Sequence, residues 1–330
     1  MNERNNDFLG TEKESKLLFK FAIPCVLSLI IQSLYNLVDQ IFIGHCEELG
    51  ATGNAATGIV YPLTIIALGI GLWLGDGTAA AMSINQGRGE TKESSRCFGS
   101  AILTGTVFSV IMTLVCFLLK DKVLRFIGAD GDILAKSSEY ADFIFGGFLF
   151  FILATVINPV IRADGNPKYA MIAMISGAIL NIILDPIFIY ALNMGMTGAA
   201  VATFTGQAVT FAISVVYLFR MKTIRLRRTD FVPKASALLR ILKFGVSSFL
   251  TQFAIVVISV INNVILAKFS AESGFDVRIT QGVVTLAFKV FGIVVSVIVG
   301  IAVGGQPVLG YNYGAGNFRR VRNSFSSLPL

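Results

Sequence analysis

Charge is scarce in this chain, and its scarcity narrows the class of protein. Only 14% of the 330 residues are charged, whereas 54% are hydrophobic, and the mean hydropathy is +0.73. Soluble globular domains carry about 25% charged residues, so these values exclude that class. The composition instead predicts a polytopic membrane protein.

Residues that carry out chemistry are also few. The chain has one histidine and four scattered cysteines, without a Cys-x-x-Cys pair. This spacing favours neither a metal site nor a disulfide framework. The sequence contains no Ser/His/Asp or Cys/His set for catalysis and no Walker motif for a nucleotide. We therefore expect neither an enzyme nor ATP-driven transport, and we expect no cofactor other than a coupling ion.

Negative charge is the rarer sign, with 20 Asp and Glu against 27 Lys and Arg. A net charge of +7 is compatible with nucleic-acid binding, but these Lys and Arg residues lie in short connectors between apolar runs. That arrangement is typical of cytoplasmic loops. We therefore expect the lipid bilayer as a partner and no nucleic acid.

Long apolar runs are what the chain has in abundance. Roughly 20 apolar residues in a helix span about 30 Å of hydrocarbon. Eight segments reach about this length: 17–43, 55–84, 97–119, 138–161, 169–190, 197–219, 244–267 and 280–309. The predicted fold is therefore all-α, with eight membrane-spanning helices.

The distribution of Lys and Arg predicts how these segments cross the membrane. With the N-terminus in the cytoplasm, 20 Lys and Arg residues fall on the inner side and six on the outer side, and Lys289 lies inside the eighth segment. Such a bias sets membrane orientation. We expect a multi-pass protein of the cell inner (plasma) membrane with a cytoplasmic N-terminus.

Three polar residues inside the apolar segments predict a cation site. Asp39 is a carboxylate in an otherwise uncharged run, and intramembrane acids commonly mark an ion or proton pathway. Asn181 and Asp185 are four residues apart and share one helix face. Because Asp39 and Asp185 both lie towards the outer ends of their segments, we expect them to meet. Their oxygens, with that of Asn181, suit Na⁺, or the two acids can share one proton.

The chain repeats its first two segments. A second copy of the first segment reads KFGVSSFLTQFAIVVISVINNVILAKF, lies 223 residues further along and places Asn262 opposite Asp39. The stretch GTAAAMSINQGRGE from Gly77 matches GGQPVLGYNYGAGN from Gly304 at an offset of 227 residues. Six segments separate the copies, so both enter the membrane in the same direction. This predicts two lobes related by an axis along the membrane normal.

These observations divide the chain into four parts. We expect a cytoplasmic tail over 1–16, a six-helix first lobe over 17–219, a basic cytoplasmic linker over 220–243 and an incomplete second lobe of two helices over 244–330. Within the linker, residues 233–243 are expected to form a short amphipathic helix on the inner membrane surface.

Four motifs together resemble the multidrug and toxic compound extrusion (MATE) family. They read YNLVDQIFIG from Tyr35, RADGNPKYAM from Arg162, NIILDP from Asn181 and QPVLGYNYGAGN from Gln306, and the resemblance covers about residues 15–323. It implies a cation-coupled antiporter, using Na⁺ or H⁺, that exports cationic or amphipathic drugs and toxic compounds. We expect it to act as a monomer.

The family pattern has twelve helices in two lobes of six, so four further helices are expected after the GAGN loop. The resemblance therefore also predicts that this chain, as it stands, inserts into the membrane without exporting drugs. Two alternatives stay open: a flippase for lipids or lipid-linked oligosaccharides of the same architecture, and a non-functional truncated fragment. An intramembrane enzyme is disfavoured because no catalytic set is present.

The resemblance also implies which residues bind the coupling cation. The matching positions are Asp39, Tyr140, Asn158, Asn181, Asp185 and Thr203. Simple alternatives exist for three of them: Asp39 and Asp185 can be acids near a helix end, and Thr203 can serve close helix packing. Asn158 lies near the inner end of its segment, away from the other positions.

A second set of residues is predicted to line the substrate cavity. These candidates are Tyr35, Asn262, Asn263, Lys289 and Gln306. Lys289 lies about 14 Å into the eighth segment, where it either pairs with an acid in the cavity or extends its amine to the outer surface.

Overall fold

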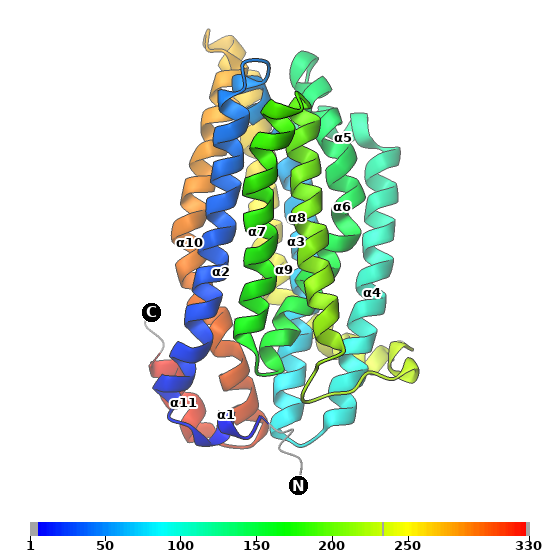
Figure 1. Ribbon diagram of the computed structural model, residues 1–330, viewed down its shortest axis with the longest axis vertical. Helices are drawn as coiled ribbons and strands as arrows, with labels where there is room; N and C mark the ends of the chain where they lie inside the picture. Colours follow the sequence, from blue (N-terminus) through cyan, green and yellow to red (C-terminus); the bar gives the residue numbers. More distant parts are fainter. Residues whose placement is uncertain (1–5, 233, 328–330) are drawn as a thin grey trace.

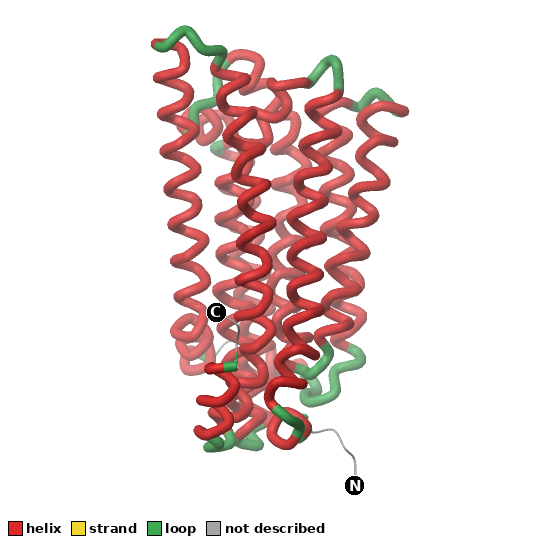
Figure 2. The backbone as a smooth tube through the Cα atoms, turned by 90° about the vertical axis from the view of Figure 1, so that its left-hand side faces the viewer, coloured by secondary structure: helices red, strands yellow, loops and turns green. Residues whose placement is uncertain are grey.

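Long helices run along a common axis and form an elongated bundle (Figures 1 and 2). The computed structural model describes residues 6–232 and 234–327, and within them eight helices are long and apolar enough to cross a membrane. These helices are α2 (Glu14–His45), α3 (Gly50–Gly87), α4 (Thr91–Leu118), α6 (Gly131–Ala163), α7 (Pro167–Pro186), α8 (Gly195–Leu218), α9 (Ala235–Glu272) and α10 (Val277–Gly314). Those same residues contain no β-strand, which confirms the predicted all-α membrane fold.

Short helices cap the two ends of the bundle. Over the described ranges they are α1 (Phe8–Thr11), α5 (Lys120–Phe126), η1 (Ile187–Ala191), η2 (Arg228–Phe231) and α11 (Phe318–Ser326). Both chain termini lie at one end, which we call the terminal end, and we call the opposite end the far end (Figure 1). The predicted tail 1–16 thus contains α1 and the first turn of α2, and its residues 1–5 lie outside the described part.

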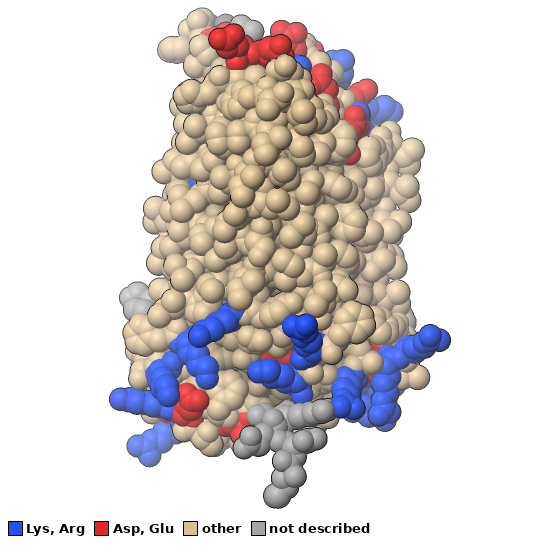
Figure 3. Space-filling model, in the orientation of Figure 1, with Lys and Arg blue, Asp and Glu red and all other residues tan. Residues whose placement is uncertain are grey.

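The outer surface has the pattern of a membrane protein. On the face shown in Figure 3, Lys and Arg gather at the terminal end, acidic residues gather at the far end, and the band between them is almost free of charge. On α4 the exposed side chains of Val107, Ile111, Leu114 and Leu118 follow a spacing of three and four residues. They form one helix face, which a bilayer would cover.

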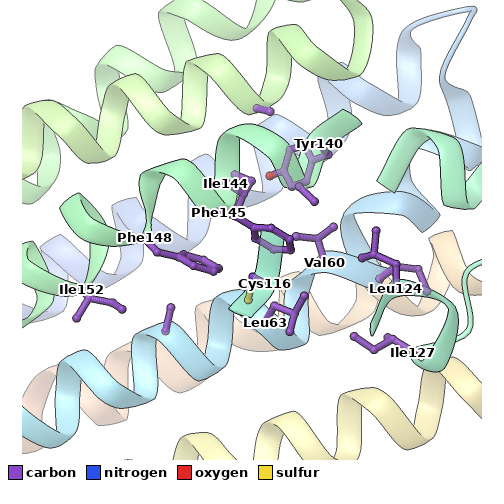
Figure 4. Close-up of a cluster of buried hydrophobic side chains, with 14 of the residues drawn as sticks. Val60, Leu63, Cys116, Leu124, Ile127, Tyr140, Ile144, Phe145, Phe148 and Ile152 are labelled. Atoms are coloured by element: carbon purple, nitrogen blue, oxygen red, sulfur yellow. The ribbon is translucent and has the colours of Figure 1, made fainter. Parts of the chain in front are cut away.

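The largest hydrophobic cluster lies between α3, α4 and α6 (Figure 4). Its centre is a pair of buried rings on α6, Phe145 and Phe148, whose centroids are 5.4 Å apart. Val60 and Leu63 of α3 and Cys116 of α4 pack against them. This cluster fixes α6 in the middle of the first lobe, where it presents its polar residues to α2, α7 and α8.

Two seams join the second copy of the repeat to the first, because α2 packs on α10 and α3 packs on α9. Both seams depend on glycines at equivalent positions. A Cβ atom on Gly77 of α3 would lie 2.2 Å from the carbonyl oxygen of Ile241 in α9. A Cβ atom on Gly304 of α10 would lie 2.5 Å from Cα of Ala22 in α2. The predicted repeat is therefore confirmed as one backbone contact that occurs twice.

The ends of α3 and α10 repeat each other as well. Gly89 and Gly316 lie just beyond the two helices, and both have φ of +76°, the left-handed conformation that glycine adopts without strain. In the first copy the N–H of Glu90 donates to the carbonyl of Asn85 over 2.8 Å, and the equivalent bond in the second copy measures 2.9 Å. The shared asparagine and glycine positions of the two motifs thus encode the same helix stop.

The linker between the lobes is shorter than predicted because α9 begins at Ala235. Residues 235–243 are the first turns of this long helix, so the expectation of a separate surface helix is wrong; Pro233 lies outside the described residues. The indole Nε1 of Trp73 in α3 donates to the carbonyl of Leu242 over 2.9 Å. The Trp73 ring stacks on Phe249 at 4.6 Å. These turns therefore pack on α3.

A buried acid holds the start of the linker. Asp164 follows α6, is fully buried and accepts hydrogen bonds from the Tyr217 hydroxyl and the Lys222 backbone N–H, both over 2.8 Å. The Thr223 backbone N–H donates to the same carboxylate over 2.9 Å. A carboxylate that accepts several N–H and O–H donors is well compensated for its burial. Asp164 therefore fixes where the linker leaves α8.

Candidate functional site

Four helices of the first lobe bring five of the six predicted cation-site residues together in the far half of the bundle. They are Asp39 on α2, Tyr140 on α6, Asn181 and Asp185 on α7 and Thr203 on α8. The exposed fraction is 4% for Asp39, 1% for Asn181 and 0% for Asp185. We call these five residues the polar cluster.

The α7 side of the polar cluster depends on a close crossing of two helices. A Cβ atom on Gly177 of α7 would lie 2.4 Å from the carbonyl oxygen of Gly206 in α8, so glycine permits the approach. The amide Nδ2 of Asn181 then lies 3.4 Å from Oδ1 of Asp185 and 3.4 Å from Oγ1 of Thr203. Asn181 therefore bridges its own helix and α8, as its spacing from Asp185 predicts.

The two acids of the polar cluster, Asp39 and Asp185, are close enough to interact electrostatically. Tyr140 interacts with both acids and with the Thr203 side chain, and Tyr35 of α2 also interacts with both acids. The predicted meeting of the two carboxylates is therefore confirmed as geometry, and Tyr35, predicted for the substrate cavity, lies beside them.

Each of three cluster residues retains an oxygen without a hydrogen bond. Among the residues that the structure describes, Oδ1 of Asp39, Oδ1 of Asn181 and Oδ2 of Asp185 are buried and have no donor within hydrogen-bond distance. The other carboxylate oxygen of Asp39 is 3.4 Å from the Gln40 amide. Buried polar atoms are nearly always paired, so three open oxygens in one cluster indicate an unfilled binding function.

The cluster has the donor chemistry of a site for a hard cation. Carboxylate, amide and hydroxyl oxygens suit Na⁺, and two nearby carboxylates can instead share one proton. Over residues 6–232 and 234–327 no group of three or more His, Cys, Asp and Glu residues could hold a metal ion. The residues that can hold a monovalent cation are Asp39, Asn181 and Asp185, and their coupling role stays a prediction.

Asn158, the sixth predicted residue, lies elsewhere. It is 18 residues after Tyr140 on α6, which separates the two by about 27 Å along the helix. Its amide Nδ2 donates to the carbonyl of Ala170 over 3.0 Å, and its Oδ1 accepts from Arg162 over 2.5 Å. Transfer by motif alone grouped Asn158 with residues that lie at the opposite end of its helix.

The partner of Asn158 belongs to a buried network that the sequence analysis missed. Arg162 of α6 lies 3.8 Å from Asp76 of α3, and both are 8% exposed. Oδ2 of Asp76 accepts from the Ser248 hydroxyl of α9 over 2.8 Å. The signal was available, because Asp76 is an acid inside the apolar segment 55–84, as Asp39 is inside 17–43. Arg162 was assigned to a cytoplasmic connector, although α6 continues to Ala163.

Lys289 of α10 reaches the polar cluster from the second copy. Its Nζ lies 3.4 Å from Oδ1 of Asn36 in α2 and 5.4 Å from the ring centroid of Tyr61 in α3. It also interacts electrostatically with Asp39. Of the two predicted alternatives, pairing with an acid therefore describes Lys289, and its amine points to the first lobe.

The other cavity candidates lie at different depths. Asn262 shares a small cavity with Lys289 and Tyr61 in the far half. The amide of Asn263 donates to the carbonyl of Gly58 over 3.0 Å and so closes the α3–α9 seam there. Gln306 donates to the backbone carbonyl of Asp76 over 3.0 Å in the terminal half. The structure therefore does not gather these residues into a single cavity.

The fold and the polar cluster define a polytopic membrane protein of the transporter class. The family model described as MatE matches residues 24–187. The multidrug export protein MepA of Staphylococcus aureus (strain MSSA476) is 26% identical over 311 residues, which cover 92% of this chain and 66% of MepA. The chain thus spans about 66% of the length of the curated relatives it matches.

Solved structures agree with this match. The MATE multidrug transporter DinF-BH, solved as a complex, is 31% identical, with a TM-score of 0.90 over 99% of this chain and 71% of that one. A MOP superfamily transporter from Pyrococcus furiosus Vc1 (DSM3638), with a binding pocket described as of reverse polarity, is 28% identical, with a TM-score of 0.84 over 97% and 70%. This chain belongs to the MATE family.

Proposed function

We propose that the chain provides the cation-binding lobe, and part of the second lobe, of a cation-coupled antiporter that exports drugs and other toxic compounds. The observation that carries the proposal is the pair Asp39 and Asp185, buried in the first lobe with an open oxygen on each. Family membership supports the transport class. The names of the relatives, a multidrug export protein and a multidrug transporter, support drugs as substrates.

The chemistry of coupling follows from the burial of two like charges. Two carboxylates in a low-dielectric site repel each other and cannot both stay ionised without a counter-charge. Na⁺ at their open oxygens, or a proton on one of them, removes this cost. The free energy of cation binding is then available to shift one lobe against the other around the shared cleft. With the terminal end in the cytoplasm, as the charge bias predicts, inward cation flow drives outward export.

The test is an efflux assay in a pump-deficient bacterial host with the full-length protein. Asp39→Asn and Asp185→Asn should each abolish cation-driven efflux, because an amide cannot exchange a proton or neutralise Na⁺. Expression and membrane insertion should be unchanged, since both substitutions remove a buried charge at nearly constant volume. Efflux driven by a Na⁺ gradient and by a pH gradient is measured separately, which identifies the coupling ion.

The matched control is Asp142→Asn. Asp142 is an acid of the same lobe on α6, its side chain is 45% exposed, and it pairs with Lys120 at 2.7 Å away from the polar cluster. This variant should pump like the wild type. Normal efflux by both cluster variants would contradict the assignment of Asp39 and Asp185.

A further inference from the structure

The seam between α2 and α10 contains an ammonium group and a carboxylate from different lobes. Lys289 comes from the second copy of the repeat and Asp39 from the first, and the two interact electrostatically. Asn36, which accepts from the Lys289 amine over 3.4 Å, precedes Asp39 by three residues and lies on the same helix face. Lys289 is therefore positioned beside the polar cluster by contacts with the helix that carries Asp39.

The ammonium supplies charge to Asp39 without occupying its open oxygen. In the described part of the chain, Oδ1 of Asp39 has no hydrogen-bond donor, and Lys289 is hydrogen-bonded to Asn36 instead. Opposite charges interact strongly at low dielectric, and either charge alone inside a membrane is costly. Lys289 thus offsets the charge of the empty acid and still leaves room for a cation.

The charged and titratable groups around Lys289 come from several elements. Asp39 lies on α2 and Tyr61 on α3, while Asp185 and the cluster tyrosines reach Lys289 only through Asp39. The neighbouring cavity residue of α9 is Asn262, which is uncharged. Asp39 is therefore the acid with which Lys289 interacts.

The same seam has a second polar contact. The hydroxyls of Ser33 on α2 and Ser296 on α10 are 2.6 Å apart. Ser296 follows Lys289 by seven residues, about two turns, so both lie on the α10 face that meets α2. A hydroxyl pair is indifferent to a cation at Asp39, whereas the Lys289 interaction depends on the charge of Asp39. Only the Lys289 contact can respond to occupancy of the site.

We propose that Lys289 is a tethered cation that competes with the coupling ion for Asp39 and so reports occupancy of the first lobe to the second. This inference rests on the proposed function, because it assumes that a cation binds at Asp39. When the site is empty, Lys289 and Asp39 hold α10 against α2. When Na⁺ or a proton neutralises Asp39, Lys289 loses its counter-charge and the contact loosens. By reciprocity, removing Lys289 strengthens cation binding.

The experiment measures the separation of the lobes at the far end. Spin labels at positions 48 and 273, in the exposed α2–α3 and α9–α10 loops, report the distance by double electron–electron resonance. The natural cysteines are first replaced by alanine at positions 25, 46, 97 and 116. The chain is placed in lipid nanodiscs and titrated with Na⁺ at constant pH, and then with protons in K⁺ buffer.

Three substitutions separate charge from shape. Lys289→Met removes the charge, and Lys289→Gln removes it while keeping a donor for Asn36. Both should show the longer distance without added cation, and their titration midpoints should fall about fivefold or more relative to the wild type. Lys268→Met, an exposed lysine of α9, is the matched control and should behave like the wild type.

Asp39→Asn completes the cycle. It should show the long distance at all cation concentrations, and adding Lys289→Met should change nothing further, because the two residues act as a pair. An unchanged resting distance in both Lys289 variants would overturn the proposal. If the wild-type distance responds to neither cation, the proposed coupling fails, while the resting distances still decide whether Lys289 ties the lobes.

Discussion

The two copies of the repeat share their backbone contacts and differ in their charges. In the first copy, α2 carries Asp39, and the equivalent position of α9 is Asn262. In the second copy, α10 carries Lys289, and the equivalent position of α3 is Pro62. One copy thus holds an acid and the other a base, and the α2–α10 seam is where they meet. The charge is asymmetric although the scaffold is symmetric.

The difference shows which features of a repeat are free to diverge. Glycines at the seams recur because a side chain there would collide with the backbone of the neighbouring helix, so few other residues fit. Polar side chains on the same helices do not hold the backbone contact, and each copy can acquire its own. The α3–α9 seam accordingly contains the Trp73–Phe249 stack, while the α2–α10 seam contains Ser33, Ser296 and Lys289.

The largest effect is expected at the buried ion pair that only the first copy has. Asp76 corresponds to Val303 in the second copy, so this pair has no equivalent there. Arg162→Met leaves Asp76 charged and Asn158 without its donor, and breaking one side of a buried pair costs about 3–5 kcal/mol. Thermal denaturation in detergent measures this loss.

The surface variant Arg96→Met, which removes a partner of Glu93, serves as the control and should cost less than about 1 kcal/mol. The double substitution Arg162→Met with Asp76→Asn should recover part of the loss, because the uncompensated charge is gone. Equal stabilities for Arg162→Met and Arg96→Met would show that the two copies do not differ in this respect.

A smaller effect is expected where the two copies agree. Gly304→Leu forces a side chain into the backbone of α2 at Ala22, and overpacking of this kind costs about 1–3 kcal/mol. Gly77→Leu should behave alike at the α3–α9 seam. Gly292→Leu is the control on α10, because a Cβ atom there meets nothing within 4 Å. If Gly304→Leu denatures at the same temperature as Gly292→Leu, the seam is not tightly packed.

The sequence predicted the parts of this protein that depend on one helix at a time. Apolar length located the eight spans, and the four-residue spacing placed Asn181 and Asp185 on one face. Their meeting with Asp39 followed from similar depth, because residues at equal depth in a small bundle are neighbours. The repeat offsets located the seam glycines, since a copied segment copies its contacts.

Other features depend on how helices are rotated and where they begin, which no single segment specifies. The acid that pairs with Lys289 became identifiable only when the register of α10 against α2 was known. Asp76 and Arg162 lie on different helices, and neither sequence position indicates the other. The start of α9 at Ala235 depends on its packing against Trp73, a contact between residues far apart in the chain.

The smallest expected effect concerns one contact that the copies fill with different side chains. Trp73 stacks on Phe249 in the α3–α9 seam, and the equivalent positions in the α2–α10 seam are Gly300 and Val26, which are also in contact. Trp73→Phe keeps an aromatic ring on Phe249 but removes the indole donor to the Leu242 carbonyl. The loss of one such hydrogen bond should lower the free energy of unfolding by about 1 kcal/mol.

Thermal denaturation of Trp73→Phe against wild type measures this hydrogen bond, and Trp73→Leu separates it from the stack. Removing the aromatic pair as well should add about 0.5–1.5 kcal/mol to the cost. If Trp73→Leu is no worse than Trp73→Phe, the ring contact contributes nothing to the seam. The α3–α9 seam would then resemble the α2–α10 seam at this level, where a glycine and a valine suffice because the glycine lets the two helices approach.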